Sequence, residues 1–209
     1  MFTGIIESLG TIYKIENINS SLKFEIFSES IIFDAINIGD SLSINGTCLT
    51  LVKKTNRDDK KLLLFDVVGE TISKTNLGIL KINEKVNLET SLKLSDGLDG
   101  HIVQGHIDTT GLIISNKLIN DNWTLEIKIN KIWLKYCIKK GSVAIDGISL
   151  TIAKINEDCS KNYGSISMSI IPHTLENTNL KYKKTNDTVN IETDFFAKYI
   201  EKLLPKDDK

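Results

Sequence analysis

The stretch Ile44-Asn45-Gly46-Thr47-Cys48-Leu49-Thr50 decides the fold, because it returns 101 residues later as Ile145-Asp146-Gly147-Ile148-Ser149-Leu150-Thr151. In both copies an apolar segment leads into an Asx-Gly pair, which supplies the positive φ of a tight turn between two strands. The substitution of aspartate for asparagine keeps the turn chemistry. Only the exchange of Cys48 for Ser149 alters a group with reactivity of its own.

The duplication extends well beyond this turn. Further blocks recur in the same order and at nearly the same spacing, which is the signature of an internal repeat. The sequence therefore predicts two similar halves that arose by tandem duplication. The other matching pairs are residues 4–10 with 105–111, 75–77 with 178–180, and 86–91 with 189–194.

A Gly- and Asp-rich segment, residues 94–100, separates the two halves and is typical of a linker. We therefore predict an N-terminal domain at residues 1–96 and a C-terminal domain at residues 97–194. Residues 195–209 have no counterpart in the first half and form a third, C-terminal segment.

Apolar residues in the C-terminal segment recur at helical spacing from Phe196 to Leu204. Asp194 is suited to cap such a helix, or alternatively to reach a pocket, and Pro205 ends the run. A helix of about ten residues is marginal alone in water. It therefore packs either against its own half or against another copy of the chain.

Each half carries the pattern of short strands. Polar and apolar residues alternate at 23–27, 125–129 and 165–170, which is the period of a half-buried strand. Turn residues separate such segments at high density, and the chain has only two prolines. The pattern predicts a small antiparallel barrel or sandwich in each half, with short helical pieces near 31–36 and 132–137.

Composition argues against several partners. The 209 residues carry a formal net charge of −1, and Arg57 is the only arginine, whereas phosphate recognition typically uses arginine. This charge balance predicts no nucleic-acid partner. A membrane is not predicted as a partner either, because no apolar run approaches the ~20 residues of a membrane span. Cys48, Cys137 and Cys159 form no CxxC pair, and without a leader segment they indicate free thiols in the cytoplasm.

Two interpretations of Cys48 are open. After a tight turn, its thiol can act as a nucleophile or polar contact beside a ligand. The alternative is a buried structural cysteine. Ser149 at the equivalent place weakens that alternative, because a thiol and a hydroxyl at one position indicate a polar requirement.

The histidines His101 and His106 each follow a glycine and lie five residues apart. This is not a usual spacing of metal ligands, so no metal site is predicted. An unperturbed pKa of ~6.5 suits a histidine in a pocket to proton transfer. A structural role in hydrogen bonding is the alternative for each of them.

These blocks resemble the riboflavin synthase alpha chain family. The resemblance rests on the opening Met1-Phe2-Thr3-Gly4-Ile5-Ile6-Glu7, on the two repeated turns, and on Gly100-His101-Ile102-Val103-Gln104-Gly105-His106-Ile107-Asp108. Ile171-Pro172-His173-Thr174-Leu175-Glu176-Asn177-Thr178 adds to it. The match runs from Met1 to about Leu204.

The resemblance implies an all-β fold: a tandem duplication of two similar six-stranded antiparallel Greek-key barrels with a C-terminal α-helix. In this family the helix helps to assemble a homotrimer, and the working site lies between the N-terminal barrel of one subunit and the C-terminal barrel of its neighbour. An association with lumazine synthase is a further implied partnership.

The implied activity is the dismutation of two 6,7-dimethyl-8-ribityllumazine molecules, without a cofactor or a metal. One molecule donates a four-carbon unit to the other, which gives riboflavin and 5-amino-6-ribitylamino-pyrimidinedione. Two identical substrates agree with two similar pockets. The alternative is a non-catalytic lumazine- or flavin-binding protein of the same fold, and the polar residues present in both halves favour the enzyme.

Position by position, the resemblance implies four catalytic residues: Cys48, His106, Ser149 and Asp194. Cys48 and His106 match polar residues that handle the nucleophile or the proton, and the other two match residues around the second ring. Cys48, His106 and Ser149 are also expected to bind substrate. The remaining substrate-binding positions are Gly4, Ile5, Ile6, Leu49, Thr50, Asp66, Val67, Val68, Gly69, Glu70, Thr71, Gly105, Ile107, Lys140, Leu150, Thr151, Ser169, Ile170, Ile171, Pro172, His173 and Thr174.

Overall fold

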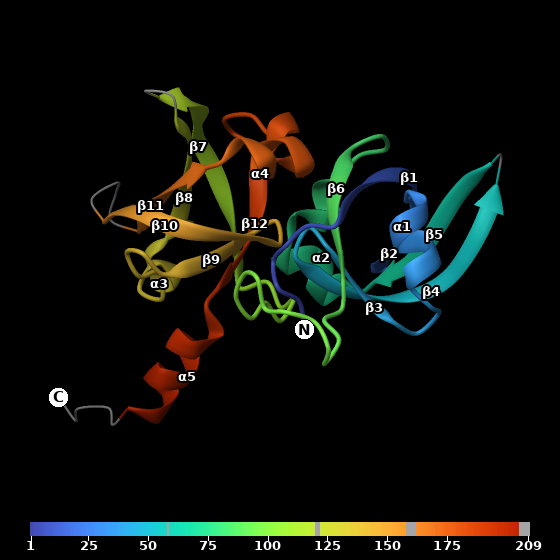
Figure 1. The fold of residues 1–209 in the computed structure, drawn as a ribbon, viewed down its shortest axis with the longest axis horizontal. Coiled ribbons are helices and arrows are strands. Elements are labelled where there is room, and N and C mark those ends of the chain that lie inside the picture. The colour runs from blue at the N-terminus through green and yellow to red at the C-terminus, as the bar shows by residue number, and fades with distance from the viewer. Residues whose placement is uncertain (58, 120–121, 158–161, 205–209) are drawn as a thin grey trace.

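The computed structural model describes residues 1–57, 59–119, 122–157 and 162–204. Two barrels lie side by side along the long axis of the molecule (Figure 1). Strands of the first half form one barrel, and strands of the second half form the other. The first barrel contains β1 (Ser8–Ile18), β2 (Ser21–Phe27), β3 (Ser41–Ile44), β4 (Thr47–Arg57), β5 (Lys60–Val67) and β6 (Lys85–Thr90).

The second barrel repeats this arrangement strand for strand. Its closed order β7-β8-β11-β10-β9-β12 is that of β1-β2-β5-β4-β3-β6, with every neighbouring pair antiparallel. The prediction of two six-stranded antiparallel barrels is therefore confirmed. The second set comprises β7 (Thr109–Ile119), β8 (Asn122–Asn130), β9 (Ser142–Ile145), β10 (Ile148–Asn156), β11 (Tyr163–Ile170) and β12 (Thr188–Thr193).

The repeated Asx-Gly pair forms the turn between β3 and β4 and between β9 and β10. Asn45 and Gly46 have φ of 47° and 78°, and Asp146 and Gly147 have φ of 45° and 82°. These left-handed values are the ones that Asx-Gly pairs adopt at low cost. The turn predicted from the repeat is therefore present in both copies.

Alternation along the strands fills each barrel with its own core. Phe24 and Ile26 of β2 are fully buried in the first barrel, and Leu125 and Ile127 of β8 are fully buried in the second. Each such side chain contributes about 1.5–3 kcal/mol by leaving water. The two cores are separate, so each half has the packing of an independent unit.

Short helices connect the strands. α1 (Ser30–Ala35) lies where a helical piece was predicted, and α3 (Lys131–Leu134) begins as predicted but ends earlier. Four more pieces were not predicted, because six residues or fewer show no clear helical period. They are α2 (Gly69–Lys74), α4 (Pro172–Asn177) and the 3-10 turns η1 (Asn76–Ile79) and η2 (Asn179–Tyr182).

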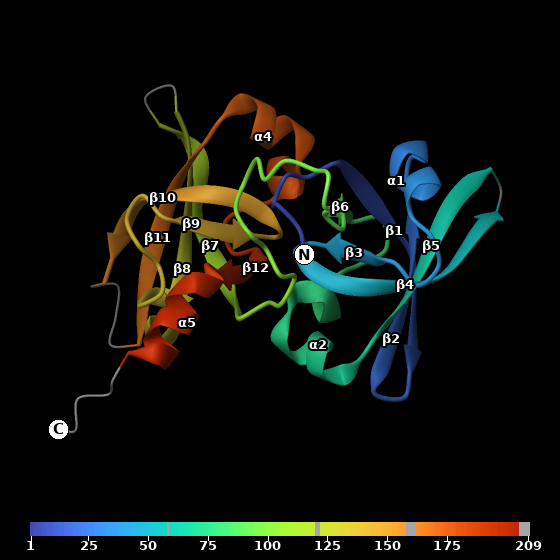
Figure 2. The same cartoon turned by 60° about the horizontal axis from the view of Figure 1, so that its bottom comes forward.

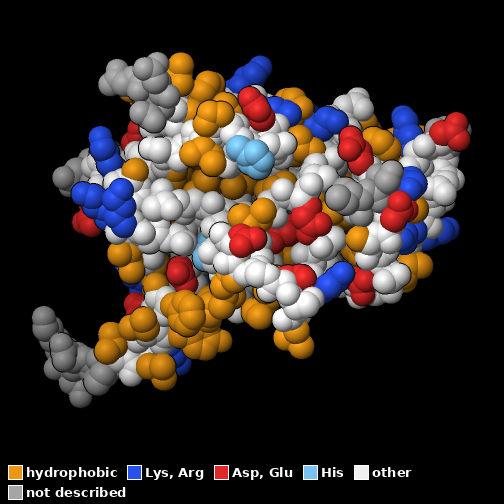
Figure 3. All heavy atoms as spheres, viewed as in Figure 1, with side chains coloured by type: hydrophobic (Ala, Val, Ile, Leu, Met, Phe, Trp, Pro, Cys, Tyr) orange, Lys and Arg blue, Asp and Glu red, His pale blue; other side chains and the backbone are white. Residues whose placement is uncertain are grey.

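The C-terminal helix α5 (Phe195–Leu203) begins at Asp194, whose Oδ1 accepts the N–H of Phe196 at 3.0 Å. It projects away from both barrels in Figure 1, and hydrophobic side chains gather over it in Figure 3. Tyr199 is 59% exposed and Leu203 is 79% exposed. The predicted helix and its cap are therefore present, with an apolar face that its own barrel leaves uncovered.

Some predictions fall outside the described residues, namely the thiol of Cys159 and the helix end at Pro205. Cys48 and Cys137 are free. Burial raises the pKa of the Cys137 thiol to about 12, which disfavours the reactive thiolate near neutral pH. Within the described ranges, no helix combines the length and the apolar character that crossing a bilayer requires.

Equivalent asparagines join the two barrels. Within the first barrel, the N–H of Asn87 donates to Asn45 Oδ1 at 2.8 Å, and within the second, the N–H of Asn190 donates to Asp146 Oδ1 at 2.7 Å. Across the interface, Asn76 Nδ2 donates to Asp146 Oδ1 at 2.9 Å. A matching bond runs from Asn179 to Asn45, so the barrels meet about an approximate twofold axis.

The interface departs from twofold symmetry at one charged pair. Lys183 Nζ lies 3.2 Å from Asp146 Oδ2, and the Asp146 side chain is fully buried. The first half has Asn45 and Leu80 at the equivalent positions. An ion pair in one half thus replaces a neutral pair in the other.

Candidate active site

The leading segment of each half crosses to the turn of the other half. The Gly4 carbonyl accepts the N–H of Ser149 at 2.8 Å, and the Gly105 carbonyl accepts the N–H of Cys48 at 2.9 Å. Phe2 and Val103 pair with each other between the barrels. Figure 2 shows both segments passing between the barrels beside the N-terminus.

Glycine is required at these crossings. Gly105 has a φ of 82°, and a Cβ there would lie 2.5 Å from Cys48 Cβ. Gly4 has a φ of 77°, and its Cβ would lie 2.7 Å from Ser149 Cβ. Both the left-handed backbone and the close approach exclude a side chain. The predicted site residues Gly4 and Gly105 therefore hold the two halves against Ser149 and Cys48.

Buried carboxylates hold the crossing segments from the other side. Glu89 accepts the N–H groups of Thr3 and Gly4, and Glu192 accepts those of Gln104, Gly105 and His106 at 2.6–3.0 Å. Burial raises the pKa of Glu192 to about 7, and the backbone N–H groups and Lys198 oppose this rise. Each barrel thus anchors its own leading segment, whose tip touches the neighbouring barrel.

The predicted residues form two equivalent surface strips. Along β4 the exposed positions are Cys48 (partly) and Thr50, and along β5 they are Asp66 and Val68 just beyond its end. Thr50 and Asp66 lie on adjacent strands, because Leu51 pairs with Phe65. We name this set, with His106 from the crossing segment, the N strip.

The C strip is the matching set on the second barrel. It consists of Ser149 and Thr151 on β10, Ser169 on β11 and Ile171 after it. Gly4 of the N-terminal segment meets it, because the Gly4 carbonyl accepts the N–H of Ser149. Each strip combines hydroxyl or carboxylate groups with an exposed aliphatic side chain, a suitable surface for one face of a polar heterocycle.

The other predicted positions lie around or beneath the strips. Leu49, Val67, Leu150 and Ile170 have buried side chains that belong to the two cores, so only their backbone faces outward. Lys140 is exposed in the turn before β9, with a φ of 69°. The positions that begin α2 and α4 are Gly69, Glu70 and Thr71, and Pro172, His173 and Thr174; Ile6 and Ile107 are half-buried in the crossing segments.

The structure brings one unpredicted residue to the C strip. His101 Nδ1 lies 2.7 Å from Ser149 Oγ. Burial lowers the pKa of His101, and the negative charge of Asp194 acts in the opposite direction. The sequence showed His101 only as one of two histidines in a glycine-rich segment. Its place beside Ser149 depends on the crossing, for which the sequence carries no local signal.

The surroundings of Cys48 differ. Its side chain packs against Phe2, Val103 and Ala144, and among the described residues no histidine is hydrogen-bonded to it. His106 is exposed and contributes only its backbone N–H to Glu192. His106 therefore comes near the N strip through its neighbour Gly105, whose carbonyl accepts the Cys48 N–H, and not through a side-chain bond to Cys48.

Comparison with known proteins shows the family. The model of the lumazine binding domain matches twice, at residues 3–91 and 104–194. The riboflavin synthase of Actinobacillus pleuropneumoniae is 39% identical over 99% of this chain and 91% of its own length. That of Buchnera aphidicola subsp. Schizaphis graminum is 40% identical, with coverage of 99% and 97%. The chain belongs to the riboflavin synthase family.

Solved structures agree with this membership. A crystal structure of LumP complexed with riboflavin has a TM-score of 0.79 and 25% identity, and the similarity covers 93% of this chain and all of that one. The riboflavin synthase of Bacillus subtilis is 35% identical over 99% of this chain. Full-length similarity to several riboflavin synthases supports the assignment of this chain as a four-carbon transferase. The alternative, a non-catalytic binding protein of the same fold, has less support.

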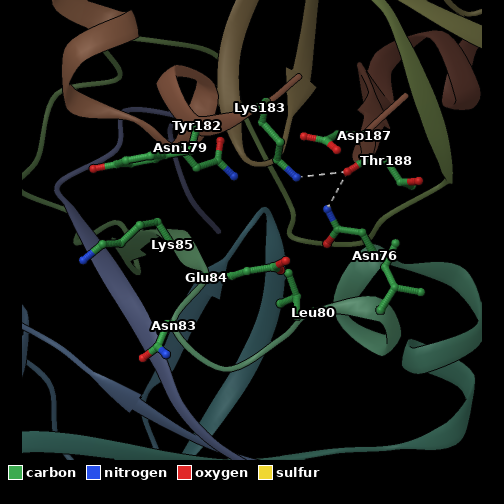
Figure 4. Close-up of a pocket in the computed structure, with 11 residues that line it drawn as sticks. Asn76, Leu80, Asn83, Glu84, Lys85, Asn179, Tyr182, Lys183, Asp187 and Thr188 are labelled. Atoms are coloured by element: carbon green, nitrogen blue, oxygen red, sulfur yellow. Dashed lines mark hydrogen bonds between the residues drawn. The ribbon is translucent and has the colours of Figure 1, made fainter. Parts of the chain in front are cut away.

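A pocket of about 380 Å³ opens between the barrels near the approximate twofold axis (Figure 4). Asn76 lines it from the first half, and Lys183 and Tyr182 line it from the second. None of the residues predicted for lumazine binding in this riboflavin synthase family member contributes to it. The pocket is therefore distinct from the two strips.

Proposed function

We propose that the chain catalyses the dismutation of 6,7-dimethyl-8-ribityllumazine to riboflavin and 5-amino-6-ribitylamino-pyrimidinedione. The observation that carries this proposal is the pair of equivalent strips, which offer two copies of one molecule the same surface but different reactive groups. The N strip presents the thiol of Cys48, and the C strip presents the hydroxyl of Ser149.

The reaction needs three things from the protein. A proton must leave the acidic 7-methyl group of one lumazine, the ring of the other must be open to a nucleophile, and the two rings must be stacked. Holding two reactants in register can lower a barrier by about 7–11 kcal/mol. We propose that Cys48, His106, Ser149 and Asp194 handle the proton and the nucleophile, and that the remaining strip residues orient the rings.

Turnover tests the proposal directly. Purified protein incubated with excess 6,7-dimethyl-8-ribityllumazine should form many riboflavin molecules per chain, followed by flavin absorbance near neutral pH. The reason is that each dismutation frees both sites for another pair of substrates. Tight binding of lumazine that stops at or below one flavin per chain would identify a binding protein and reject the enzyme.

The two strips lie on different barrels, and each faces outward. We therefore propose that the N strip of one subunit faces the C strip of its neighbour, within a homotrimer. The exposed apolar face of α5 supports assembly, because Phe196, Tyr199, Ile200 and Leu203 are each at least 55% exposed. Free thiols at Cys48 and Cys137 support a cytoplasmic location, where an association with lumazine synthase would supply substrate.

Removal of the chain after Asp194 should convert the trimer to smaller species. The helix carries an uncovered apolar face, and polar contacts such as that of Lys198 with Asp108 join it to its own barrel. Sedimentation velocity at several protein concentrations measures the mass. An unchanged assembly mass, with circular dichroism showing intact barrels, would contradict this role for α5.

A further inference from the structure

The pocket between the barrels has an approximately twofold lining. Residues that line it in the first half recur in its lining 103 residues later, so the duplication supplied both walls. With about 380 Å³, the pocket has room for a small organic molecule. The pairs that decide its chemistry are Asn76 with Asn179, Leu80 with Lys183, and Glu84 with Asp187.

Each half contributes one carboxylate to this pocket. Glu84 and Asp187 lie in equivalent turns, where one oxygen of each accepts the backbone N–H of the residue three positions earlier, at 3.1 and 2.7 Å. Neither carboxylate forms an ion pair with any residue that the structure describes. The second oxygen of each is therefore available to a ligand.

The buried side of the pocket holds an amide oxygen that lacks a donor. Asn76 Nδ2 donates to Asp146 Oδ1 at 2.9 Å and to the Thr188 carbonyl at 3.3 Å, which fixes the orientation of the amide. Asn76 Oδ1 then has no donor in the described part of the chain. Figure 4 shows this oxygen turned to the side on which Glu84 lies. A buried acceptor of this kind is unfavourable unless a ligand supplies the donor.

The second half shows which donor suits the interface. Lys183 is the equivalent of Leu80, and its Nζ lies 3.2 Å from Asp146 Oδ2 and 3.0 Å from the Thr188 carbonyl. Leu80 offers no donor on the side of the first half. An ammonium group from a ligand would supply there what Lys183 supplies opposite.

The charge of the pocket also favours a cation. The carboxylates of Glu84, Asp187 and the buried Asp146 outnumber the ammonium groups of Lys85 and Lys183. Both lysines are engaged, Lys183 with Asp146 and Lys85 with a threonine hydroxyl of β1 at 2.7 Å. An anion would instead meet two carboxylates and an amide oxygen.

We propose that this pocket binds a short aliphatic diamine. One ammonium group donates to Asn76 Oδ1 and Glu84, the other donates to Asp187, and the methylene chain lies along Leu80. Two charged ends thus match the two carboxylates that the duplication provides. Because the ligand contacts both halves, it stabilises the arrangement of the two barrels. The pocket shares no residue with the two strips, so the site does not depend on the proposed dismutation.

Isothermal titration calorimetry of the full chain with 1,4-diaminobutane tests the site. In a low-salt buffer the Kd should lie below about 1 mM, within the range for so small a ligand. The matched ligand 1-aminobutane, with one ammonium group, should bind at least about 10-fold more weakly, and neutral 1,4-butanediol should show no binding. At about 100 times its Kd, the diamine should raise the unfolding temperature by about 5–10 °C.

Two isosteric variants remove the charges. Glu84→Gln and Asp187→Asn keep an oxygen for the N–H of the turn, and each should weaken diamine binding about 10-fold. Asp40→Asn is the matched control, because Asp40 accepts the N–H of Asn37 in the same way, at 2.8 Å, but lies outside the pocket. It makes the same change in net charge and should leave the Kd unaltered.

Leu80→Lys tests the place of the ammonium group. It gives the first half the side chain that the second half has at Lys183, so it should abolish diamine binding. Leu80→Met keeps the apolar wall and should retain binding within about 3-fold. Circular dichroism and the unfolding temperature without ligand check that each variant is folded.

Three results would overturn the proposal. The first is no diamine binding by the folded wild-type chain. The second is equal affinity for 1,4-butanediol, which would show that the charges are irrelevant. The third is an equal loss in Asp40→Asn and Glu84→Gln, which would indicate attraction to the net charge alone. Flavin formation is measured separately, so a failure of the dismutase proposal leaves these results unaffected.

Discussion

Replacement of Lys183 by leucine should lower the free energy of unfolding by about 3 kcal/mol. Asp146 is fully buried between the barrels, and Lys183, only 14% exposed, is its cation at 3.2 Å. Removing one partner leaves a buried charge without compensation, which typically costs about 3–5 kcal/mol. Three neutral donors remain on the carboxylate, from Asn76, Asn179 and Asn190, and these place the expected loss at the lower end.

The first half of the chain supplies the matched control. Its equivalent pair is Asn45 and Leu80, so the double variant Asp146→Asn with Lys183→Leu gives the second half the neutral pair of the first. The double variant should lose at least 1.5 kcal/mol less than the sum of the two single variants, a coupling of ordinary size for contacting residues, about 0.5–3 kcal/mol. Urea unfolding at one fixed protein concentration measures all four chains. Additive losses would contradict a direct ion pair.

The largest loss is expected from Gly46→Ala. Gly46 has a φ of 78°, and a Cβ there would lie 2.6 Å from the backbone nitrogen of Gly147 in the other half. The left-handed backbone costs an alanine about 1–2 kcal/mol, and overpacking adds about 1–3 kcal/mol. Backbone atoms cannot turn aside as a flexible side chain does. We therefore expect a loss of more than 3 kcal/mol, or separation of the two barrels.

Gly39→Ala separates the two causes. Gly39 has a φ of 93°, yet a Cβ at that position would have no neighbour within 4 Å. It should therefore lose only the backbone cost of about 1–2 kcal/mol. Thermal and urea unfolding of both variants give the comparison. Equal losses in the two variants would show that the contact between Gly46 and Gly147 is unimportant.

The elements of the barrels were predictable because their signals are local. Two-residue alternation at 23–27 and the left-handed turn at Asn45-Gly46 are properties of a few consecutive residues, and the duplication repeats them. The helix after Asp194 has a cap and a helical period within ten residues. By contrast, α2 and η1 are too short for a period, and the limits predicted for the domains stay predictions.

Candidate site residues were predictable only as positions in a motif. The family resemblance assigned Cys48 and Ser149 to equivalent positions of the two halves. It also assigned Leu49 and Leu150 to the site, without distinguishing that their side chains point into the barrels. Their alternation along β4 and β10 contains that information. His101 was not predicted as a site residue, because nothing in its glycine-rich segment indicates which distant serine it will contact.

By itself, the sequence determined that this protein consists of two copies of one antiparallel β unit, a barrel or a sandwich, with a thiol in one copy and a hydroxyl in the other at the same turn. The tertiary structure alone decided that each leading segment crosses to the other barrel, and so that His101 lies against Ser149 while Cys48 has apolar neighbours. The physical reason is the separation along the chain of the residues that interact. Strands and turns follow from neighbours along the chain, whereas the crossing depends on buried Glu89 and Glu192 and on close glycine contacts between residues far apart in sequence.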